Sequence, residues 1–429
     1  MPLTTPAGQE RRVPKGGTNT CLILTESFPY PGGDDYLVHE IKAWAATGLN
    51  IVVAPTRVGG TPFTLPAEVA VDLSLADLCS ARAEPFYAMR AATSKLLWKD
   101  IARLVRNRRL SQAAIVSCLR SVARTLRSKQ GLKAIVRDRG RIFLAYSYWN
   151  DTESFAAALC KIDGTVEHVV SRAHGFDLYS EGRPGNLLPL KDQLIETFDG
   201  IFTVSEQGRQ YLIQRHSIPI DRVHVSRLGI RVPDFVCPPS QSGAFTLVSL
   251  SSCVELKRID KLIAGLAETA MHNPEIDYTW HHIGDGPLLG KLRGQAQATL
   301  SRRPNIRFHF EGKLDNEEVF DFFRDHNIDV IVNTSDTEGA PVSLMEAMGC
   351  SIPAIAPDVG GVHEIVGQGM GCLMRSQPDA AEIGAAIDAS LDFAKDPSVR
   401  RAVRTFIHST YNASDNYSAF VRQCLAVTS

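Results

Sequence analysis

The chain has 429 residues, of which 44% are hydrophobic and 22% charged, and its formal net charge is −1. This composition excludes a collagenous, fibrous or wholly disordered protein, and the near-neutral charge excludes a global attraction to nucleic acid. The length is more than one ordinary hydrophobic core fills, so we expect two domains.

Cysteine usage and hydropathy indicate the compartment. The nine cysteines are scattered and form no C-x-x-C pair or Cys/His spacing that would bind zinc, which favours a reducing compartment. No apolar run approaches the ~18 residues that a transmembrane helix needs. The polar stretch 1–19 lacks the apolar core of a signal peptide, so we interpret it as a disordered tail. We expect a cytoplasmic protein, either free or peripheral on the inner face of the membrane.

In the first half of the chain, short β-branched runs alternate with helical patterns. Apolar residues at Leu37, Ile41 and Trp44 predict a helix that ends at Gly48. Strands are predicted at 21–25, 50–55, 142–147, 168–174 and 200–205. This alternation predicts a parallel sheet with helices on both faces.

The segment 82–141 interrupts that alternation. It holds sixteen basic and three acidic residues, a net charge of +13, on an apolar pattern of helical spacing. Three interpretations remain open. The segment is a solvated helical face, or a surface for anionic lipid, where each Lys or Arg contributes up to ~1 kcal/mol, or a nucleic-acid face. The last is the least favoured, because aromatic residues are not interleaved with the basic ones.

The pattern restarts after the Pro-, Ser- and Gly-rich stretch 231–244, which we interpret as a linker. Strands are then predicted at 245–251, 277–284, 306–312, 329–335 and 351–357. We therefore divide the chain into a first domain, a second domain and a C-terminal helix that packs back on the first domain; their bounds are 20–232, 233–408 and 409–429. Ligands of such sheets lie at the carboxyl ends of the strands, so two facing sheets predict a site in the cleft between them.

The stretch "NTSDTEGAPVSLMEAMGCSIPAIAPDVGG" (333–361) places seven residues between Glu338 and Glu346. Two carboxylates this close form an acid/base pair, a metal site, or one catalytic and one binding group. Glu338 lies in the loop after a predicted buried strand, and Glu346 lies inside the following helix, which Gly349 closes. The two can therefore contact different atoms of one elongated ligand.

The start of that helix predicts an anion site. Pro341 suits the first turn, and the free backbone N–H groups of Val342, Ser343 and Leu344 point back toward the strand end. Glu338 is then expected beside the bound anion.

The Glu-x7-Glu spacing and the following Gly-Gly turn in "APDVGGVHEIV" resemble the retaining glycosyltransferases of family 4. Four other stretches are similar to motifs of that family. "TLVSLSSCVELKRIDKLIAGL" contains its phosphate-binding lysine, "HHIGDGPLLGKL" its Gly-Asp-Gly-Pro turn, "SRAHGFDLY" its His-Gly-x-Asp element, and "ESFPYPGGDDYLVHEI" its first glycine loop. "YSYWND" and "SSCVELKR" suggest the capsule, exopolysaccharide or O-antigen branch, and the resemblance covers most of residues 20–425.

The resemblance implies an α/β protein of the GT-B architecture. Two Rossmann-like domains are expected to face each other across a deep cleft, with 82–141 as a helical insertion in the first. The first domain is expected to bind the acceptor and the second the nucleotide sugar.

Three residues are implied as catalytic. Lys257 neutralises the diphosphate leaving group, and Glu338 contacts the donor sugar or stabilises positive charge in the transition state. His174 touches the donor sugar or orients the acceptor hydroxyl, unless it is a structural histidine. Asp177 is expected on the acceptor side, where it fixes His174.

The remaining residues are implied in donor binding. Glu346 accepts hydrogen bonds from the ribose hydroxyls, because an ionised carboxylate is a pure acceptor. The family usually has an arginine at the position of Ser252, so the diphosphate is expected to rest on Lys257, Arg258 and the helix amides. Further donor-binding positions are Gly32, Gly33, Gly284, Gly286, Gly339, Ala340, Pro341, Val342 and Ser343. No metal and no cofactor is implied, because lysine and helix amides take the place of a divalent cation.

We therefore expect a retaining glycosyltransferase that moves a sugar from a UDP- or GDP-linked donor to a glycan or lipid-linked acceptor, in cell-surface polysaccharide biosynthesis. Retention follows from the family and not from the spacing. The alternatives are a non-catalytic polysaccharide-assembly subunit, or a nucleotide-sugar epimerase or phosphorylase on the same fold.

Overall fold

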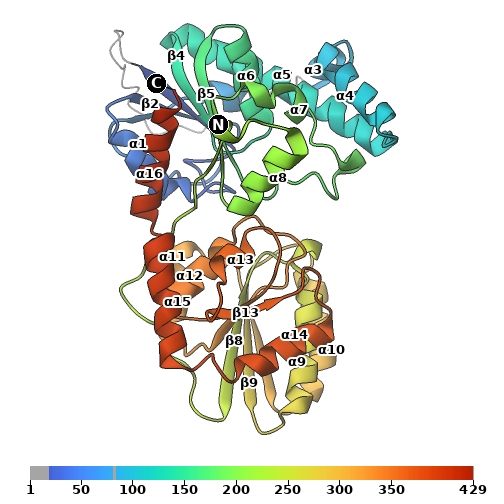
Figure 1. Cartoon of the computed structure of the whole chain (residues 1–429), viewed down its shortest axis with the longest axis vertical. Helices are drawn as coiled ribbons and strands as arrows, with labels where there is room; N and C mark the ends of the chain where they lie inside the picture. Colours follow the sequence, from blue (N-terminus) through green and yellow to red (C-terminus); the bar gives the residue numbers. More distant parts are fainter. Residues whose placement is uncertain (1–18, 81–83, 429) are drawn as a thin grey trace, which may run out of the picture.

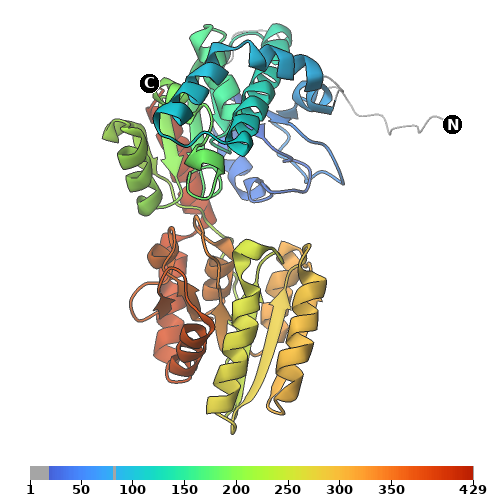
Figure 2. The ribbon, with the colours of Figure 1, turned by 90° about the vertical axis from the view of Figure 1, so that its right-hand side faces the viewer.

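The computed structural model describes residues 19–80 and 84–428. These residues form two α/β domains that lie one above the other, and the chain's last helix returns to the first domain (Figures 1 and 2). Most of the predicted tail 1–19 falls outside the described residues.

The first domain is built on a seven-stranded parallel sheet in the order β3-β2-β1-β4-β5-β6-β7. Its strands are β1 (Thr20–Thr25), β2 (Asn50–Pro55), β3 (Val69–Val71), β4 (Ile142–Ser147), β5 (Val166–Ala173), β6 (Gly200–Thr203) and β7 (Val223–Val225). Its helices are α1 (Leu37–Ala45), α2 (Ser74–Ser80), α3 (Glu84–Ala92), α4 (Lys95–Arg106), α5 (Gln112–Arg139), α6 (Thr152–Ile162), α7 (Lys191–Leu194) and α8 (Glu206–His216).

The second domain is built on a six-stranded parallel sheet in the order β10-β9-β8-β11-β12-β13. Its strands are β8 (Ala244–Leu250), β9 (Asp277–Ile283), β10 (Ile306–Gly312), β11 (Val330–Val332), β12 (Ala354–Pro357) and β13 (Gly371–Met374). Its helices are α9 (Ile259–His272), α10 (Leu289–Thr299), α11 (Asn316–Asp325), α12 (Val342–Gly349), α13 (Val362–Ile365), α14 (Ala380–Ser390) and α15 (Pro397–Thr410), and the chain ends with α16 (Ala413–Ala426).

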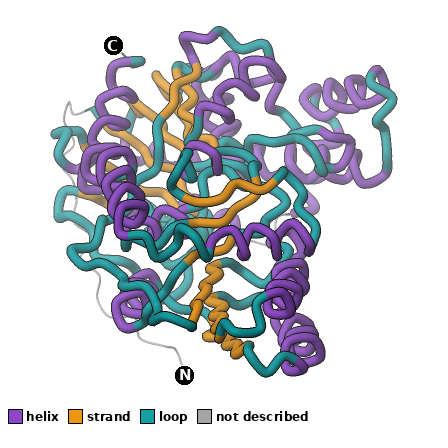
Figure 3. Tube along the Cα trace, turned by 60° about the horizontal axis from the view of Figure 1, so that its bottom comes forward, coloured by secondary structure: helices purple, strands orange, loops and turns teal. Residues whose placement is uncertain are grey.

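Helices enclose the strands of both sheets (Figure 3), as expected when parallel strands are joined by helical crossovers. Buried strands such as β1, whose six residues are all buried, supply the core of each domain. The sequence-based prediction of two Rossmann-like α/β domains is confirmed.

The C-terminal helix α16 belongs spatially to the first domain, where it packs on α1 (Figure 1). Phe420 of α16 is fully buried, and its ring contacts Trp44, Tyr146 and Phe202. The guanidinium of the buried Arg172 lies 3.9 Å from the centre of the Phe420 ring. The chain therefore crosses between the domains a second time, just before α16.

The strand orders decide where a ligand can bind. In the second sheet β8 lies between β9 and β11, and in the first sheet β1 lies between β2 and β4, so the order reverses beside β8 and beside β1. Ligands of open parallel sheets lie outside the carboxyl ends of the strands at such a reversal. The loops after β8, β11, β1, β4 and β5 are therefore the ones that build the site.

Candidate active site

Lys257 is positioned by two neighbouring strand-end loops of the second domain. It ends a short 3-10 turn, Glu255–Lys257, that follows β8. The loop after β11 holds this turn, because Thr334 Oγ1 donates to the carbonyl of Lys257 at 2.8 Å and the amide of Asp336 donates to Leu256 O at 2.9 Å. The lysine side chain is thereby directed at the loop that carries Glu338.

Glu338 lies at the centre of the second domain's half of the site. One carboxylate oxygen accepts from Lys257 Nζ at 2.7 Å and from Asn333 Nδ2 at 3.0 Å. Only 10% of the Glu338 side chain is exposed. A partly buried carboxylate with a cation on one oxygen is a fixed negative charge that faces the domain junction.

The two domains touch where both loops have glycine. A β-carbon placed on Gly339 would lie 2.6 Å from the amide nitrogen of Gly175, the residue after His174. A β-carbon on Gly360 would lie 1.8 Å from the carbonyl oxygen of Glu338, and Gly361 N donates to Gly339 O at 2.7 Å. Glycine is required at this contact because backbone meets backbone with no room for side chains.

A second bridge between the domains lies at α8. Glu364 of α13 accepts from the amide of Gln207, in the first turn of α8, at 3.1 Å, and from Arg227 at 3.1 Å. A carboxylate is favoured at a helix N-terminus by the helix dipole. This bridge supports the glycine contact beside it.

Glu346 is buried at the junction and is hydrogen-bonded from both domains. Asn316 Nδ2 donates to it at 2.5 Å, and the Tyr36 hydroxyl of the first domain also bonds to it. Burial raises the pKa of Glu346 to about 7, although the bonds from Asn316 and Tyr36 act in the opposite direction. Glu346 therefore changes its charge near neutral pH.

Helix α12 begins at Val342, and Pro341 is the residue immediately before it. The sequence-based prediction that Pro341 lies in the first turn was wrong by one position; a residue without an N–H fits either place, because helix starts leave their first amides free. Val342 and Ser343 are the first two residues of this helix, and the half-buried Ala340 precedes the proline. The start of α12 thus adjoins Glu338 and Gly339.

His174 follows β5 in the first domain, with its ring between two aromatic residues. The centre of the imidazole lies 4.8 Å from the ring of Tyr148 and 4.5 Å from that of Trp149. Neither ring nitrogen has a hydrogen-bond partner among the described residues, and Nδ1 lies 3.8 Å from Asp177. The imidazole is therefore fixed in place and has both nitrogens available.

Asp177 holds the loops after β4 and β5 together. Its carboxylate accepts from the amides of His174 and Asn150, each at 2.6 Å. Burial alone would raise the pKa of Asp177, but the nearby His174 and Lys191 hold it below its usual value. Burial lowers the pKa of Lys191, which donates to the Asp177 carbonyl, to about 8. The carboxylate of Asp177 is therefore ionised, and it holds the backbone of the two loops in place.

Arg258 and Ser252, two further residues predicted to bind the donor, lie with Lys257 in the loop after β8. The guanidinium of Arg258 is already paired with Asp260 at 3.1 Å and with Asp336 at 3.3 Å. Ser252 is exposed, and its hydroxyl makes no hydrogen bond among those of the described residues. Of the cations after β8, Lys257 is thus the one directed at Glu338.

Gly284 and Gly286 follow β9 and pack against the backbone of the loop after β8. Their φ angles are 148° and 155°, and a β-carbon on Gly284 would lie 1.9 Å from the carbonyl oxygen of Ser251. The amide of Cys253 donates to Asp285 O at 2.9 Å. The Gly-Asp-Gly turn thus fixes the backbone of residues 251–253.

Gly32 and Gly33 lie in a compact, exposed loop after β1. The buried carboxylate of Asp34 closes the loop by accepting from the amides of Glu26 and Phe28, at 2.6 Å and 3.0 Å. A β-carbon on Gly32 would lie 1.8 Å from Ser27 Oγ. The tight loop leads directly to Tyr36, and so to Glu346.

The sequence interpretation missed four residues of this site: Tyr36, Gly175, Asn316 and Asn333. Asn333 follows a predicted strand directly and Gly175 stands inside the quoted His-Gly-x-Asp element, so both had a signal. Tyr36 and Asn316 had no signal in the sequence, because they reach Glu346 only through the way in which the chain folds.

Comparisons with known proteins test the family and the fold. Residues 244–392 match the family described as glycosyl transferases group 1. The chain is 27% identical over 222 residues to the O-antigen biosynthesis glycosyltransferase WbnH of Escherichia coli, which is 51% of this chain and 59% of that protein. It is 25% identical over 238 residues to the putative colanic acid biosynthesis glycosyltransferase WcaL of E. coli K12, or 53% of this chain and 56% of that one. The chain thus spans less than two thirds of the length of these relatives.

Two solved structures resemble the whole chain. Sucrose-phosphate synthase from Thermosynechococcus elongatus has a TM-score of 0.66 at 17% identity, with 95% of this chain and 99% of that chain covered. Anabaena HepE in complex with UDP-glucose has a TM-score of 0.63 at 15% identity, with 95% and 99% covered. These likenesses confirm the predicted GT-B fold. Residues 244–392, which lie within the second domain, thus match the group 1 glycosyl transferases, and the whole chain has the GT-B fold.

Proposed function

We propose that this protein is a retaining glycosyltransferase that moves a sugar from a UDP- or GDP-linked donor to a glycan or lipid-linked acceptor, in the synthesis of a cell-surface polysaccharide. The observation that carries the proposal is the meeting of Lys257 and Glu338 with the His174 loop at the glycine contact between the domains. The names of WbnH and WcaL support the polysaccharide, and the UDP-glucose in HepE supports a UDP-linked donor.

The donor diphosphate is assigned to Lys257 and the first turn of α12. An ammonium has three N–H donors, so Lys257 can keep its bond to Glu338 and still donate to a phosphate oxygen. The free amides at the start of α12 add a partial positive charge from the same side. Arg258 is assigned a supporting part, because Asp260 and Asp336 already offset its charge.

The reaction is assigned to one face of the donor sugar. The acceptor hydroxyl attacks the anomeric carbon from the side on which the diphosphate leaves. The bond from carbon to phosphate oxygen breaks, the new glycosidic bond forms, and the acceptor proton passes to the leaving phosphate. Glu338 stabilises the positive charge that builds on the sugar ring, and His174 donates to or accepts from a sugar or acceptor hydroxyl.

Replacing Lys257 by alanine tests the assignment of the leaving group. We expect release of UDP or GDP from a panel of nucleotide sugars to fall by about 10²–10³-fold in Lys257→Ala, which is the usual cost of losing one donor to a developing anion. Its thermal midpoint should stay near that of the wild type, because the side chain is partly exposed.

Lys291→Ala, an exposed lysine of α10, is the matched control and should keep full turnover. If wild-type protein released no nucleotide from any donor of the panel, the proposed function would be wrong. A loss of thermal stability as large as the loss of turnover would make Lys257 a structural residue instead.

Ionisation of the Glu346 carboxyl group should make both folding stability and donor binding depend on pH. Its pKa is about 7 when folded and 4.5 in a free chain, so its ionisation opposes folding as the pH rises from 4.5 through 7. The cost reaches roughly 3 kcal/mol above pH 7. Donor binding needs the ionised form to accept from two ribose hydroxyls, so affinity for UDP-glucose should rise about tenfold from pH 6 to pH 8.

Calorimetry and denaturant unfolding of Glu346→Gln at pH 5 and pH 8 measure both effects. We expect the variant to gain stability relative to wild type at pH 8 more than at pH 5, and to bind donor weakly at both. Glu317→Gln, an exposed carboxylate on α11, should behave as wild type. Unchanged donor affinity in Glu346→Gln would remove Glu346 from the ribose site.

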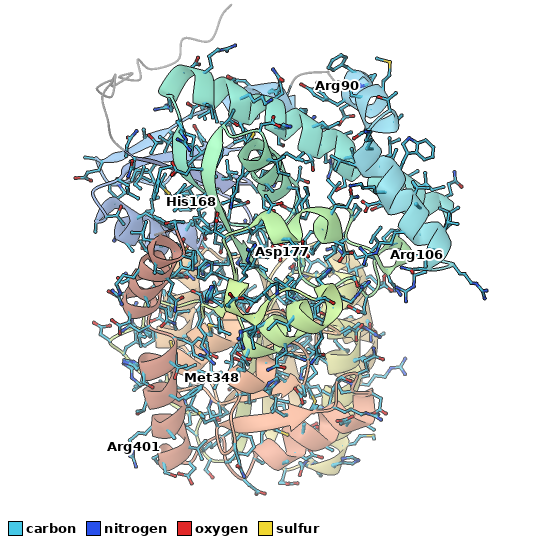
Figure 4. The ribbon with its side chains drawn as sticks, turned by 45° about the horizontal axis from the view of Figure 1, so that its top comes forward. Arg90, Arg106, His168, Asp177, Met348 and Arg401 are labelled. Atoms are coloured by element: carbon cyan, nitrogen blue, oxygen red, sulfur yellow. The ribbon has the colours of Figure 1, made fainter. Side chains whose placement is uncertain are left out.

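A membrane surface is proposed for the outer helices α3 and α4 with the loop to Arg109, which project from the first domain (Figure 1). Phe86, Met89 and Trp98 are there 51%, 63% and 60% exposed. Arg90 and Arg106 lie on the same projecting helices (Figure 4). No carboxylate pairs with the described basic residues of this face, which are Arg90, Lys95, Lys99, Arg106, Arg108 and Arg109. Exposed aromatic rings among unpaired cations suit an anionic lipid interface.

Three other basic residues of the segment form ion pairs within the first domain. Lys129 and Lys133 of α5 pair with Asp163, and Arg139 pairs with Asp72. Part of the +13 charge therefore stabilises the first domain internally. Arg82 lies outside the described residues. Among the described helices, none combines the length and the apolar character that crossing a bilayer needs.

Vesicle binding tests this surface. Binding to vesicles with 30% phosphatidylglycerol should exceed binding to neutral vesicles and should fall with salt, as the Debye length shortens. Reversing Lys95, Lys99, Arg106 and Arg109 to Glu should weaken it at least tenfold, and reversing Lys291, Arg302, Arg307 and Arg401 of the second domain should not. Equal binding to both kinds of vesicle would contradict the membrane surface and favour the interpretation of α3 and α4 as a solvated helical face.

A further inference from the structure

A cavity of about 680 Å³ opens in the first domain between α5 and the loops that follow β4 and β5. We call it the α5 cavity. Its volume lies in the range of pockets that hold small molecules. Its lining comes from the N-terminal half of α5, which belongs to the inserted segment, and from residues within 150–155 and 176–191.

The α5 cavity adjoins the domain junction. Phe176 and Asp177 line it, and they follow His174 and Gly175 directly in the chain. Asp177 lies near the middle of the molecule, away from Arg90 and Arg106 on the outer helices (Figure 4). A ligand in this cavity can therefore present a hydroxyl to the junction without touching the proposed membrane surface.

Buried polar atoms without partners line the same cavity. The Asn150 side chain is in a residue only 1% exposed, and neither its oxygen nor its nitrogen is hydrogen-bonded among the described residues. Oδ1 of Asp151 is also unpartnered. A buried polar atom without a partner destabilises the fold, so such atoms are rare unless a ligand or water completes them. Asn150 is held in place because its amide donates to Asp177 at 2.6 Å.

The cavity also carries unpaired guanidinium groups. Arg120 and Arg124 lie one turn apart on α5, are exposed, and have no carboxylate partner among the described residues. Arg183 also lines the cavity, where it donates to the carbonyl of Phe176 and stacks 3.9 Å from the centre of its ring. Three arginines around one space can donate in pairs to the oxygens of a phosphate.

The acidic residues of the cavity do not offset these charges. Asp177 is already matched by Lys191 and its amide donors. Burial and the neighbouring Glu153 raise the pKa of Asp151 well above its usual range, which disfavours its charged form. The basic residues that line the cavity, Arg120, Arg124, Arg183 and Lys191, also outnumber its two carboxylates. The field in the α5 cavity is therefore positive.

We propose that the α5 cavity binds the acceptor and that this acceptor carries a phosphate or diphosphate beside its sugar. Arg120, Arg124 and Arg183 hold the phosphate, and the Asn150 amide binds a hydroxyl of the sugar that His174 faces. The proposal rests on the proposed function, because it names the substrate class of the same site. The phosphate can come from a lipid carrier or from a phosphate within a glycan, since both present the same oxygens to arginine.

The test uses UDP-saturated protein, so that phosphate probes cannot occupy the donor site. Three probes are compared by calorimetry: undecyl diphosphate-linked N-acetylglucosamine, methyl N-acetylglucosaminide 6-phosphate, and phosphate-free undecyl N-acetylglucosaminide. We expect at least one phosphate probe to bind ten times more tightly than the phosphate-free one. Preference for the first probe indicates a lipid carrier, and preference for the second a phosphorylated glycan.

The variant R120Q/R124Q should lose at least tenfold in affinity for the preferred phosphate probe, with unchanged affinity for UDP. The matched control R137Q/R141Q changes two exposed arginines in the same segment outside the cavity and should bind as wild type. Equal binding of all three probes, no binding of any, or equal losses in the two double variants would overturn the proposal. In each of these outcomes, retained nucleotide release from a donor leaves the proposed function standing, and its absence refutes that function separately.

Discussion

The site depends on a contact between two backbones. Gly175 after β5 and Gly339 after β11 approach so closely that a β-carbon on Gly339 would lie 2.6 Å from the amide nitrogen of Gly175. Gly360 and Gly361 extend the contact, because the first lies against the carbonyl of Glu338 and the second donates to Gly339 O. No other residue type fits there, and with the loops farther apart His174 would not reach the surroundings of Lys257 and Glu338.

Polar groups around this contact are held at a cost to stability. Glu346 is buried where its ionised form is disfavoured, and His174 and Asn150 have side-chain atoms without partners among the described residues. A protein selected for stability alone would fill such positions with apolar side chains. Their presence at the ends of β4 and β5 and on α12 is what a site that binds a polar ligand requires.

Most strands of the two sheets were predicted from the sequence. Buried parallel strands are continuous apolar runs, so they can be recognised without knowing which strands lie beside them. The sequence-based prediction missed the edge strands β3 and β7 and the strand β13, whose three or four residues are too short to show a period. It also extended β11 to Ser335, whereas the strand ends at Val332. The side chains of Asn333 and Thr334 instead hold the loop that carries Glu338.

The site was predictable only where its residues are close in sequence. Glu338 and Glu346 share one motif, and Lys257 follows a strand in a recognisable stretch. Tyr36 and Asn316 approach Glu346 from different elements, and nothing local marks them. Arg120 and Arg124 look like an ordinary solvated helical face until the structure places the Asn150 loop beside them.

Replacing Gly339 by alanine tests the central claim, that the site exists only where the two domains meet. The β-carbon of Gly339→Ala would separate the loops, whereas Gly290→Ala adds a β-carbon with no atom within 4 Å. The measurement is nucleotide release from the preferred donor at saturating concentration, together with UDP affinity. We expect Gly339→Ala to lose about 10²-fold in nucleotide release while it still binds UDP, and Gly290→Ala to behave as wild type. Release at the wild-type rate from Gly339→Ala would contradict a site that depends on the domain contact.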